Sequence, residues 1–348
     1  MWKQPTKQFT ETTPTDPGRL GIPHVKRFWE QALAKRNGVA LNPAGQSWRA
    51  DNLLLNGLGL PLQETMRYLM QSAPSLAEFE DWILARNGGQ LTPLQTSRLR
   101  SALAGEPHDE QLLAQFRAIE ASPEVLSADD LRHWNEHGYV IVRGAISKEQ
   151  ARATEAAVWT ELGMDPQRPA SWYEKPIGQG MMMDFYHHPT LRENRRSPRI
   201  HKAFAQLWGT ADLWATTDRT SLNPPETATY FHQGTPLHWD MSLRPPFHFG
   251  TQGLIYLCDT PAHQGAFSCV PGFQNRLETW LAGLPTGTDP RRVDLTALVK
   301  PIAAEAGDMV IWHHFLPHGS TPNRGTYPRI VQYLNMYPLE FKENVEWL

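Results

Sequence analysis

The chain has few cysteines and no long apolar run. Its 348 residues contain two cysteines, Cys258 and Cys269, so a fold held together by several disulfides is excluded and a reducing compartment is favoured. No stretch approaches the roughly 20 apolar residues that a transmembrane helix needs, and the first ten residues lack the apolar core of a signal peptide. We therefore expect a soluble cytoplasmic protein that does not act at a membrane.

An excess of charge of one sign is also missing. The 33 Lys and Arg residues nearly balance the 36 Asp and Glu residues, and the formal net charge is -3. This balance argues against a general binder of nucleic acid. The hydrophobic content of 40% is enough for a full core, either in one large domain or in a domain with an extension. Oligomeric state is left open by these numbers.

The N-terminal part predicts helices only. Residues 1–22 are polar and rich in Thr and Pro, which is typical of a flexible leader. Residues 23–122 carry helix signals, among them the caps Ser75 and Thr92 and a helix end at Asn37-Gly38. We expect this range to form a helical extension to a larger domain that spans residues 123–348. Its job is not indicated by the sequence.

From residue 126 the pattern becomes mixed. Ser127 can cap a helix that ends near Gly138, a short strand follows at 139–142, and Ser147 with Gln150 is a capping-box signature for the next helix. Short runs punctuated by Pro, Gly and aromatic residues fill 214–337 and favour an all-β barrel or sandwich. Residues 163–200 are expected to be irregular, either as a lid or substrate wall or as a surface loop packed by its own aromatics.

One triplet carries the chemistry. His238 and Asp240 lie two residues apart in Gln233-Gly-Thr-Pro-Leu-His-Trp-Asp240, which we expect to be a half-buried strand, so both would point to the same side. His318, between two strand-like runs, can supply a third ligand. Two imidazoles and one carboxylate form the facial triad of non-heme Fe(II) oxygenases. Because His-x-Asp occurs often by chance, the triplet needs context; the alternative is a hydrogen-bonded pair of barrel residues and an unrelated loop histidine.

Further motifs follow the triplet in order: the buried strand Gly253-Leu-Ile-Tyr-Leu-Cys258, the turn Gly265-Ala-Phe-Ser-Cys-Val-Pro-Gly272, Gly307-Asp308 before a strand, His318-Gly-Ser320, and Arg329 eleven residues after His318. This order resembles the phytanoyl-CoA dioxygenase family. The likeness extends upstream to Leu126–Arg143 and covers roughly residues 126–338. The chain departs from the family in Pro271-Gly-Phe-Gln274, where Pro-Gly-Ser-His is frequent.

The resemblance implies a mixed α+β fold, with a double-stranded β-helix (a jelly-roll, cupin-like barrel) flanked by helices. It also implies an Fe(II)/2-oxoglutarate-dependent dioxygenase that uses O2 and oxidises a small molecule while 2-oxoglutarate becomes succinate and CO2. His238, Asp240 and His318 would be the metal ligands. The alternatives are a barrel-fold iron enzyme that does not use 2-oxoglutarate, and a metal-free binding protein on the same fold. We expect the oxidation to be a hydroxylation, although the sequence does not distinguish it from desaturation or ring formation and does not indicate the substrate.

A fixed cation is needed for the distal carboxylate of 2-oxoglutarate. Arg329 heads a strand and a guanidinium can grip a carboxylate with two hydrogen bonds, so we expect Arg329 in this role, with Arg324 as the fallback. By the same resemblance, Ser320 and Tyr256 would support the co-substrate and Asn223 would reach its other end. Ordinary strand packing or turn capping is the alternative for these three.

Other histidines and basic residues of the chain have a simpler structural explanation than a functional one. His313 and His314 are adjacent on a strand, so at most one faces inward, and a structural role is favoured. Another group could line a pocket for a polar or anionic substrate, although scattered solvated side chains are the simpler interpretation: Lys175, His187, His188, Arg219 and Arg244. The run Met181-Met-Met183 suits adaptable packing at a pocket edge.

Overall fold

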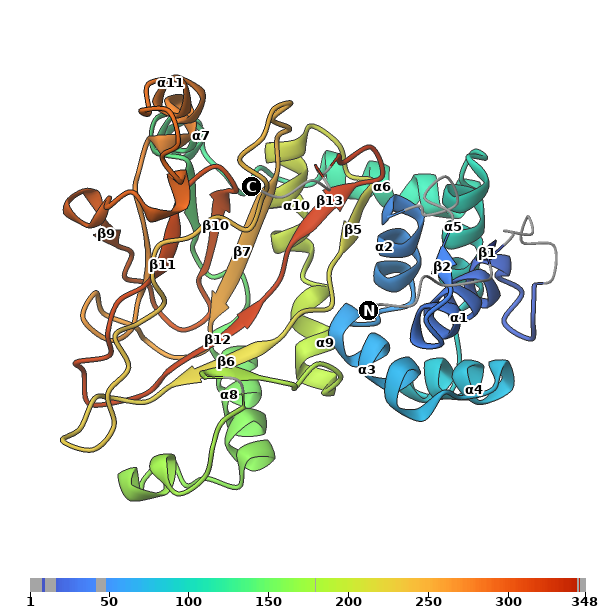
Figure 1. The fold of residues 1–348 in the computed structure, drawn as a ribbon, viewed down its shortest axis with the longest axis horizontal. Coiled ribbons are helices and arrows are strands. Elements are labelled where there is room, and N and C mark those ends of the chain that lie inside the picture. The colour runs from blue at the N-terminus through green and yellow to red at the C-terminus, as the bar shows by residue number, and fades with distance from the viewer. Residues whose placement is uncertain (1–7, 10–16, 42–47, 179, 343, 345–348) are drawn as a thin grey trace, which may run out of the picture. The chain divides into compact units, whose positions relative to one another are not determined.

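The structure is a computed structural model that describes residues 8–9, 17–41, 48–178, 180–342 and 344 (Figure 1). The chain divides into two compact units. Unit 1 contains Met1–Ala118 and Trp214–Thr217, and unit 2 contains Ile119–Leu213 and Asp218–Leu348. Most of the leader expected at 1–22 lies outside the described residues. Among the described helices, none combines the length and apolar character needed to cross a membrane.

Unit 1 is built on helices, as its caps predict. Ser75 and Glu78 form a complete capping box, and the Thr92 side chain accepts a hydrogen bond from the Gln95 amide, so both helices begin where the sequence indicates. Two short strands pair in parallel, β1 (Gln8–Phe9) with β2 (Ala40–Leu41). The helices are α1 (Pro23–Arg36), α2 (Trp48–Gly57), α3 (Leu62–Ser72), α4 (Leu76–Arg86), α5 (Pro93–Ala104) and α6 (Glu110–Ala121), the last of which ends past the unit boundary.

Unit 2 mixes helices with short strands. Its α-helices are α7 (Ala128–His137), α8 (Lys148–Leu162), α9 (Pro189–Arg195), α10 (Pro198–Trp208) and α11 (Leu277–Ala282). Its 3₁₀ turns are η2 (Pro169–Tyr173), η3 (Phe273–Asn275), η4 (Pro290–Arg292) and η5 (Thr296–Leu298). The strands are β3 (Tyr139–Val142), β4 (Met182–Met183), β6 (Thr220–Asn223), β7 (Thr251–Tyr256), β8 (Phe267–Cys269), β9 (Lys300–Pro301), β10 (Met309–His313), β11 (His318–Ser320), β12 (Arg329–Tyr333) and β13 (Met336–Pro338), while β5 (Leu213–Ala215) spans the unit boundary.

Two antiparallel sheets make the barrel of unit 2. The larger has the strand order β3-β10-β7-β12-β6-β4, and the smaller has the order β11-β8-β9. Val310, Tyr256 and Val331 of the larger sheet share one buried cluster with Phe267 and Cys269 of the smaller one, so the two sheets pack face to face. The cupin-like jelly-roll fold expected from the sequence is therefore confirmed.

Helices cover the outer face of the larger sheet. Gln332 of β12 turns outward, where its side-chain oxygen accepts a hydrogen bond from Asn194 of α9 at 2.9 Å and its amide donates to the Leu191 carbonyl at 3.0 Å. Asn194 also donates to Thr154 of α8 at 2.9 Å. Because neighbours along a strand alternate, Arg329, Val331 and Tyr333 face the barrel interior. The expectation of an irregular 163–200 is wrong in part, since α9 and the start of α10 fall in that range.

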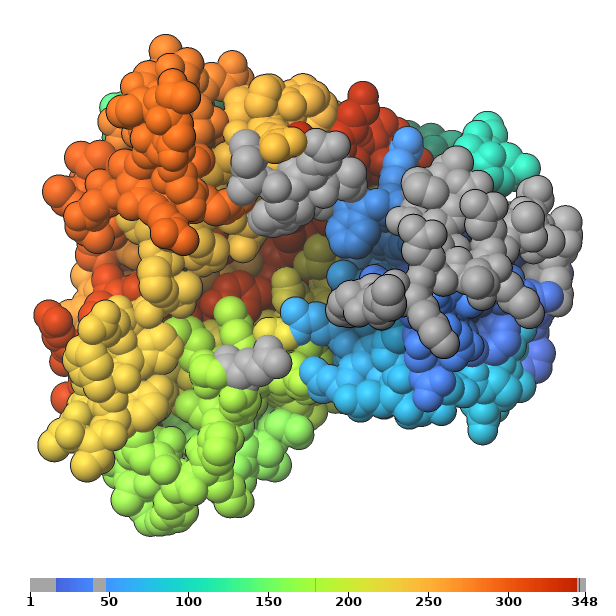
Figure 2. Space-filling view, viewed as in Figure 1, coloured from blue at the N-terminus to red at the C-terminus, as the bar shows by residue number. Residues whose placement is uncertain are grey.

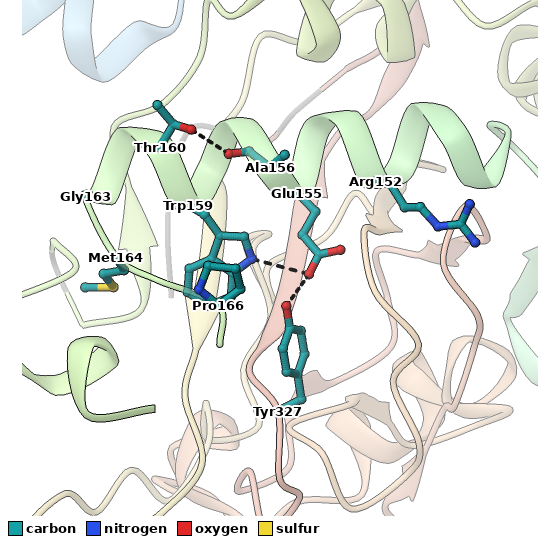
Figure 3. A pocket seen from close by; sticks show the side chains of 9 residues that line it. All are labelled: Arg152, Glu155, Ala156, Trp159, Thr160, Gly163, Met164, Pro166 and Tyr327. Carbon is teal, nitrogen blue, oxygen red and sulfur yellow. Dashed lines mark hydrogen bonds between the residues drawn. The ribbon is translucent and has the colours of Figure 1, made fainter. Parts of the chain in front are cut away.

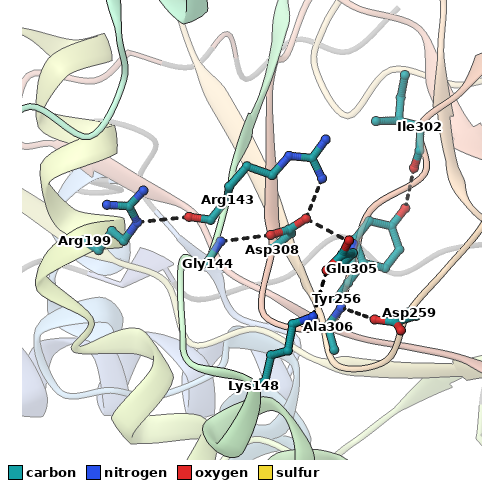
Figure 4. Close-up of polar contacts among 10 residues, drawn as sticks. All are labelled: Arg143, Gly144, Lys148, Arg199, Tyr256, Asp259, Ile302, Glu305, Ala306 and Asp308. Carbon is teal, nitrogen blue, oxygen red and sulfur yellow. Dashed lines mark hydrogen bonds and ion pairs between the residues drawn. The ribbon is translucent and has the colours of Figure 1, made fainter.

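A carboxylate fixes the start of β10 against the end of β3 (Figure 4). Asp308 is nearly buried, and its two oxygens accept hydrogen bonds from the Gly144 amide at 2.9 Å and from Arg143 Nη1 at 2.6 Å. Its backbone oxygen accepts from the Tyr256 amide at 2.9 Å. The Gly307-Asp308 motif therefore has a structural explanation: it sets the register of the strand that leads toward His318.

Candidate active site

His238 and His318 are joined through their backbones. The His238 amide donates to the His318 carbonyl and the His318 amide donates to the His238 carbonyl, both at 3.0 Å. Their ring centroids are 4.5 Å apart. The strand expected at 233–240 is wrong, because His238 forms only an isolated bridge. The alternation holds nevertheless: Trp239 and Met241 are buried, while Asp240 is exposed.

Two glycines allow this close pairing. A Cβ added to Gly319 would lie 2.2 Å from the Thr235 carbonyl oxygen, and one added to Gly234 would lie 2.1 Å from the Ser320 carbonyl oxygen. Gly234 also has a φ of 79°, a conformation that favours glycine. Any larger residue at either position would push the segment that carries His238 away from β11.

Both imidazoles are oriented in the same way. His238 Nδ1 lies 2.9 Å from the Pro236 carbonyl oxygen, and His318 Nδ1 lies 3.1 Å from the Leu316 carbonyl oxygen. A carbonyl only accepts, so each Nδ1 carries a proton. In the neutral form of such a ring the free electron pair lies on Nε2, the form that binds a metal. Burial and the neighbouring His318 lower the pKa of His238, which favours this neutral form.

Asp240 completes the trio. Its carboxylate lies 3.6 Å from His238 Nε2 and 3.3 Å from His318 Nε2, and one ligand atom from each of the three residues falls within 4.8 Å of the others. Burial opposes ionisation, yet a hydrogen bond donated by His318 and the positive charge that His318 and His238 carry when protonated hold the pKa of Asp240 well below its usual range. The carboxylate is therefore ionised at neutral pH. Among the described residues, this is the group of His, Cys, Asp and Glu side chains arranged to hold a metal ion.

A chain of side chains supports Asp240 from the larger sheet. Gln252 of β7 donates from Nε2 to Asp240 Oδ2 at 2.7 Å, and its own oxygen accepts from Trp312 Nε1 of β10 at 3.0 Å. An indole only donates, so Trp312 fixes which end of the Gln252 amide faces Asp240. Gln252 and Trp312 are cross-strand partners in the sheet register, and sequence patterns gave no signal for either residue.

Arg291 holds the backbone on both sides of Asp240. It comes from η4, in the segment between α11 and β9 that Figure 2 draws in orange at one end of unit 2. Its Nη1 donates to the Trp239 carbonyl at 2.9 Å and its Nη2 to the Met241 carbonyl at 2.6 Å. The Arg291 guanidinium thus provides the hydrogen bonds that a neighbouring strand would otherwise give to these two carbonyls. Sequence reasoning missed Arg291 because it lies about fifty residues from the triplet in an irregular stretch.

Arg329 is buried inside the barrel with no opposite charge. It is 1% exposed, and Nη1 has Ser221 Oγ at 3.3 Å and Met181 Sδ at 3.6 Å as partners. Its Nε, and both polar atoms of the Asn223 side chain on the paired strand, have no hydrogen-bond partner among the described residues. Arg329 also forms no ion pair with any described residue. An isolated buried charge of this kind costs several kcal/mol, so it is expected where an anionic ligand binds.

Sheet register relates Arg329 to the trio. In the smaller sheet His318 pairs with Cys269. Gly265, four residues before Cys269, lies against Arg329: a Cβ added to Gly265 would be 3.5 Å from the Arg329 Cβ. Four residues along a strand span roughly 13 Å. An extended arginine side chain and a five-carbon dicarboxylate can together cover that distance.

A family model decides the relationship. The model of the phytanoyl-CoA dioxygenase family matches residues 134–331, which is more than half of the chain. The chain belongs to this family. Members use Fe(II), 2-oxoglutarate and O2. A curated Dictyostelium discoideum protein named "Putative phytanoyl-CoA dioxygenase" is 22% identical over 266 residues, which is 62% of this chain and 76% of that protein.

Solved structures similar to this chain include an enzyme of nogalamycin biosynthesis. The non-heme alpha-ketoglutarate-dependent carbocyclase SnoK from nogalamycin biosynthesis is 20% identical and has a TM-score of 0.46, with 63% of this chain and 87% of that chain covered. AviO1 from Streptomyces viridochromogenes is 19% identical, with a TM-score of 0.45 and coverages of 62% and 96%. HygX from Streptomyces hygroscopicus, solved with nickel and 2-oxoglutarate, is 16% identical, with a TM-score of 0.44 and coverages of 64% and 90%.

The residues present fit the cofactors of the phytanoyl-CoA dioxygenase family. Two imidazoles and one carboxylate are the donor set of a facial triad for Fe(II), and His238, Asp240 and His318 bring these donors together. The buried Arg329 guanidinium suits a dicarboxylate, because it forms no ion pair with a described residue and its Nε has no hydrogen-bond partner among them. The Asn223 side-chain amide, which also has no partner among the described residues, suits the same ligand. The fit rests on orphaned polar atoms of this chain.

The other residues expected to contact the co-substrate are Ser320, Tyr256 and Arg324. The Ser320 hydroxyl accepts from the Thr235 amide at 2.9 Å. The Tyr256 hydroxyl donates to the Ile302 carbonyl at 3.0 Å and accepts from the Phe267 amide at 2.9 Å, which favours a structural role. Arg324 is 72% exposed and its Nε lies 3.7 Å from Glu226, so its guanidinium is at the surface, as its turn-like sequence predicts.

Histidines near the site serve packing. His314 is buried, with Nε2 bonded to the His248 carbonyl oxygen at 2.6 Å, and His313 Nδ1 accepts from the Phe315 amide at 3.1 Å. Burial lowers the pKa of His313 to about 3 and that of His314 to about 4, so both are neutral. Neither belongs to the metal-ligand trio, in agreement with the structural role favoured from the sequence.

An open pocket of about 460 Å³ lies along α8 (Figure 3). Tyr327 donates to Glu155 Oε1 at 2.6 Å and Trp159 Nε1 donates to the same oxygen at 3.4 Å. Arg152 also lines the pocket. The pocket therefore carries one basic and one acidic side chain, and its charge does not favour an anionic or a cationic ligand. Because α8 covers the outer face of the larger sheet, this pocket is separate from the barrel interior.

Proposed function

We propose that this protein is an Fe(II)/2-oxoglutarate-dependent dioxygenase that oxidises a small molecule by hydroxylation. His238, Asp240 and His318 would hold the iron, and Arg329 would hold the distal carboxylate of 2-oxoglutarate. The proposal is supported by the trio His238, Asp240 and His318 together with the buried Arg329 guanidinium, which forms no ion pair with a described residue and faces the same barrel interior.

Bound iron and 2-oxoglutarate would supply the chemistry, in which O2 oxidises the substrate and 2-oxoglutarate becomes succinate and CO2. The chain itself contributes orientation. Carbonyl-bound Nδ1 protons keep both Nε2 atoms free, and Gln252 and Arg291 hold Asp240 from the carboxylate and from the backbone. The buried apolar cluster beneath the trio keeps bulk water from that side of the reacting groups.

Turnover of the co-substrate tests the reaction class. Protein purified without oxygen and loaded with Fe(II) is expected to convert 2-oxoglutarate to succinate when O2 is admitted. His238→Ala and Asp240→Ala each remove one of three ligands and should abolish succinate formation and bound iron. Full turnover by either variant would refute the assignment of the trio.

A matched pair of arginine variants tests the co-substrate site. Arg329→Ala should raise the 2-oxoglutarate concentration needed for half-maximal rate by about 100-fold or more, since a charge-assisted bidentate pair is lost, while iron binding is retained. Arg324→Ala removes a surface arginine and should leave that concentration unchanged. An Arg329→Ala protein that loses iron but keeps normal co-substrate affinity would contradict the role of Arg329. Such a result would favour an iron enzyme that does not use 2-oxoglutarate.

A further inference from the structure

A second arginine faces the barrel interior from the larger sheet. The ladder between β12 and β6 pairs Arg329 with Asn223 and Gln332 with Thr220, and the Tyr333 amide donates to the Arg219 carbonyl at 3.0 Å. Residue 219 therefore stands opposite Tyr333. Cross-strand partners point to the same face, and Tyr333 packs against the interior cluster, so the Arg219 side chain leaves the sheet on the interior side.

The register also puts Arg219 within two residues of the level of Gln252, the residue of the larger sheet that contacts Asp240. Tyr333 pairs with Leu254 of β7 on its other side, and Gln252, two residues from Leu254, donates to Asp240. Arg329 stands four residues away from this level, roughly 13 Å along the strands. The two inward arginines thus occupy different positions, one deep where the co-substrate is proposed and one beside the reacting centre, across the sheet from Gln252.

The guanidinium of Arg219 is anchored by one end only. Its Nε lies 3.4 Å from the Tyr186 hydroxyl and 3.7 Å from Asp184 Oδ1, and that hydroxyl donates to Asp184 at 2.9 Å. Asp218 accepts a hydrogen bond from the Arg219 backbone amide at 2.7 Å. The side chain is 16% exposed. Asp184 and Tyr186 therefore fix the direction of the Arg219 side chain. Its two Nη groups have no hydrogen-bond partner among the described residues.

We propose that Arg219 binds a carboxylate of the substrate through its two Nη groups, and that the substrate is a small organic acid. A planar guanidinium presents two parallel N–H groups that match the two oxygens of a carboxylate. With its acid group on Arg219, a substrate lies across the barrel interior with a carbon next to the metal-ligand trio. This inference rests on the proposed function, because it takes the trio as the reacting centre.

Binding to an inert complex tests the proposal without turnover. The full chain is saturated with Ni(II) and 2-oxoglutarate, which fills the trio and Arg329, and calorimetry then measures binding of hexanoate, octanoate and decanoate, each against its primary amide. In the unmodified chain at least one acid should bind about 10- to 100-fold more tightly than its amide, the effect of a charge-assisted hydrogen bond. Arg219→Gln should remove that preference, Arg219→Lys should keep part of it, and Arg292→Gln, at a side chain 86% exposed, should keep all of it.

Each result has one meaning. Absence of any acid-selective binding in the unmodified chain, or an acid preference that survives in Arg219→Gln, overturns the role of Arg219. The first titration of the series, 2-oxoglutarate into the Ni(II) protein, reports on the proposed function separately. If 2-oxoglutarate fails to bind, that function fails, and the comparison of acids with amides is then made with Ni(II) alone. Folding of each variant is checked by its thermal unfolding midpoint.

Discussion

His238 and His318 form a reciprocal backbone pair, with two hydrogen bonds of 3.0 Å between residues eighty positions apart in the chain. Each residue also bonds its ring to the carbonyl two positions before it. Backbone pairing fixes the separation of the two Cα atoms, and the ring bonds fix the direction of each Nε2. The two Nε2 atoms are therefore held in a fixed relation by the protein itself.

Gly319→Ala should disrupt this pair. The added methyl would meet the Thr235 carbonyl oxygen at 2.2 Å and force the His238 segment away from β11. We expect Fe(II) affinity to fall at least tenfold, because a displaced ligand costs more than a weakened outer contact. Equilibrium dialysis measures this affinity. Gly283→Ala is the matched control, since the nearest atom to its added Cβ is an ordinary 3.4 Å away; equal metal affinity in the two variants would contradict the account.

Gln252→Leu should weaken the metal site without touching a ligand. The substitution removes the 2.7 Å hydrogen bond to Asp240 and leaves Trp312 Nε1 without its acceptor. Loss of such an outer hydrogen bond typically lowers metal affinity about 10- to 100-fold. Competition against a chelator gives the value. Unchanged affinity would mean that Asp240 needs no support from the larger sheet.

Arg291→Met should loosen the segment that carries Asp240. Two hydrogen bonds from a charged donor are lost, at the Trp239 and Met241 carbonyls, and we expect the free energy of unfolding to fall by about 2–4 kcal/mol together with metal affinity. Chemical denaturation with and without Ni(II) separates the two effects. Arg292→Met, the exposed neighbour, should change neither quantity. Stability loss with full metal affinity would assign Arg291 a purely structural role.

The two cysteines should be unreactive in the folded protein. Burial raises the pKa of Cys258 and of Cys269 to about 12, so both thiols stay protonated near pH 8. Alkylation by iodoacetamide, followed by mass spectrometry, should be slow until denaturant is added. Above the ordinary thiol pKa of about 8.5, the unfolded chain ionises these thiols and the folded chain does not. Their contribution to stability is therefore complete below that pH and declines above it; rapid labelling of either thiol at pH 8 would contradict their burial.

Much of the architecture follows from local signals. Ser75, Ser127 and Ser147 each form the capping box that their sequence predicts, because the cap and its partner lie within one helical turn. The family resemblance carried by the order of the strand motifs implies a jelly-roll barrel, which the two packed sheets confirm. The strand expected around His238 fails because its carbonyls are bonded by Arg291, a distant side chain that local periodicity does not contain.

The sequence by itself determined the chemical types of the trio, the caps of the helices, the order of the strands and the relationship to the phytanoyl-CoA dioxygenase family. Only the tertiary structure decided which distant residues meet: His318 with His238, Gln252 with Asp240, and Arg219 with Tyr333. The physical reason is that alternation along a strand says which residues share a face, whereas the register between strands is set by packing over the whole barrel. Contacts between distant segments are therefore visible only in the folded chain.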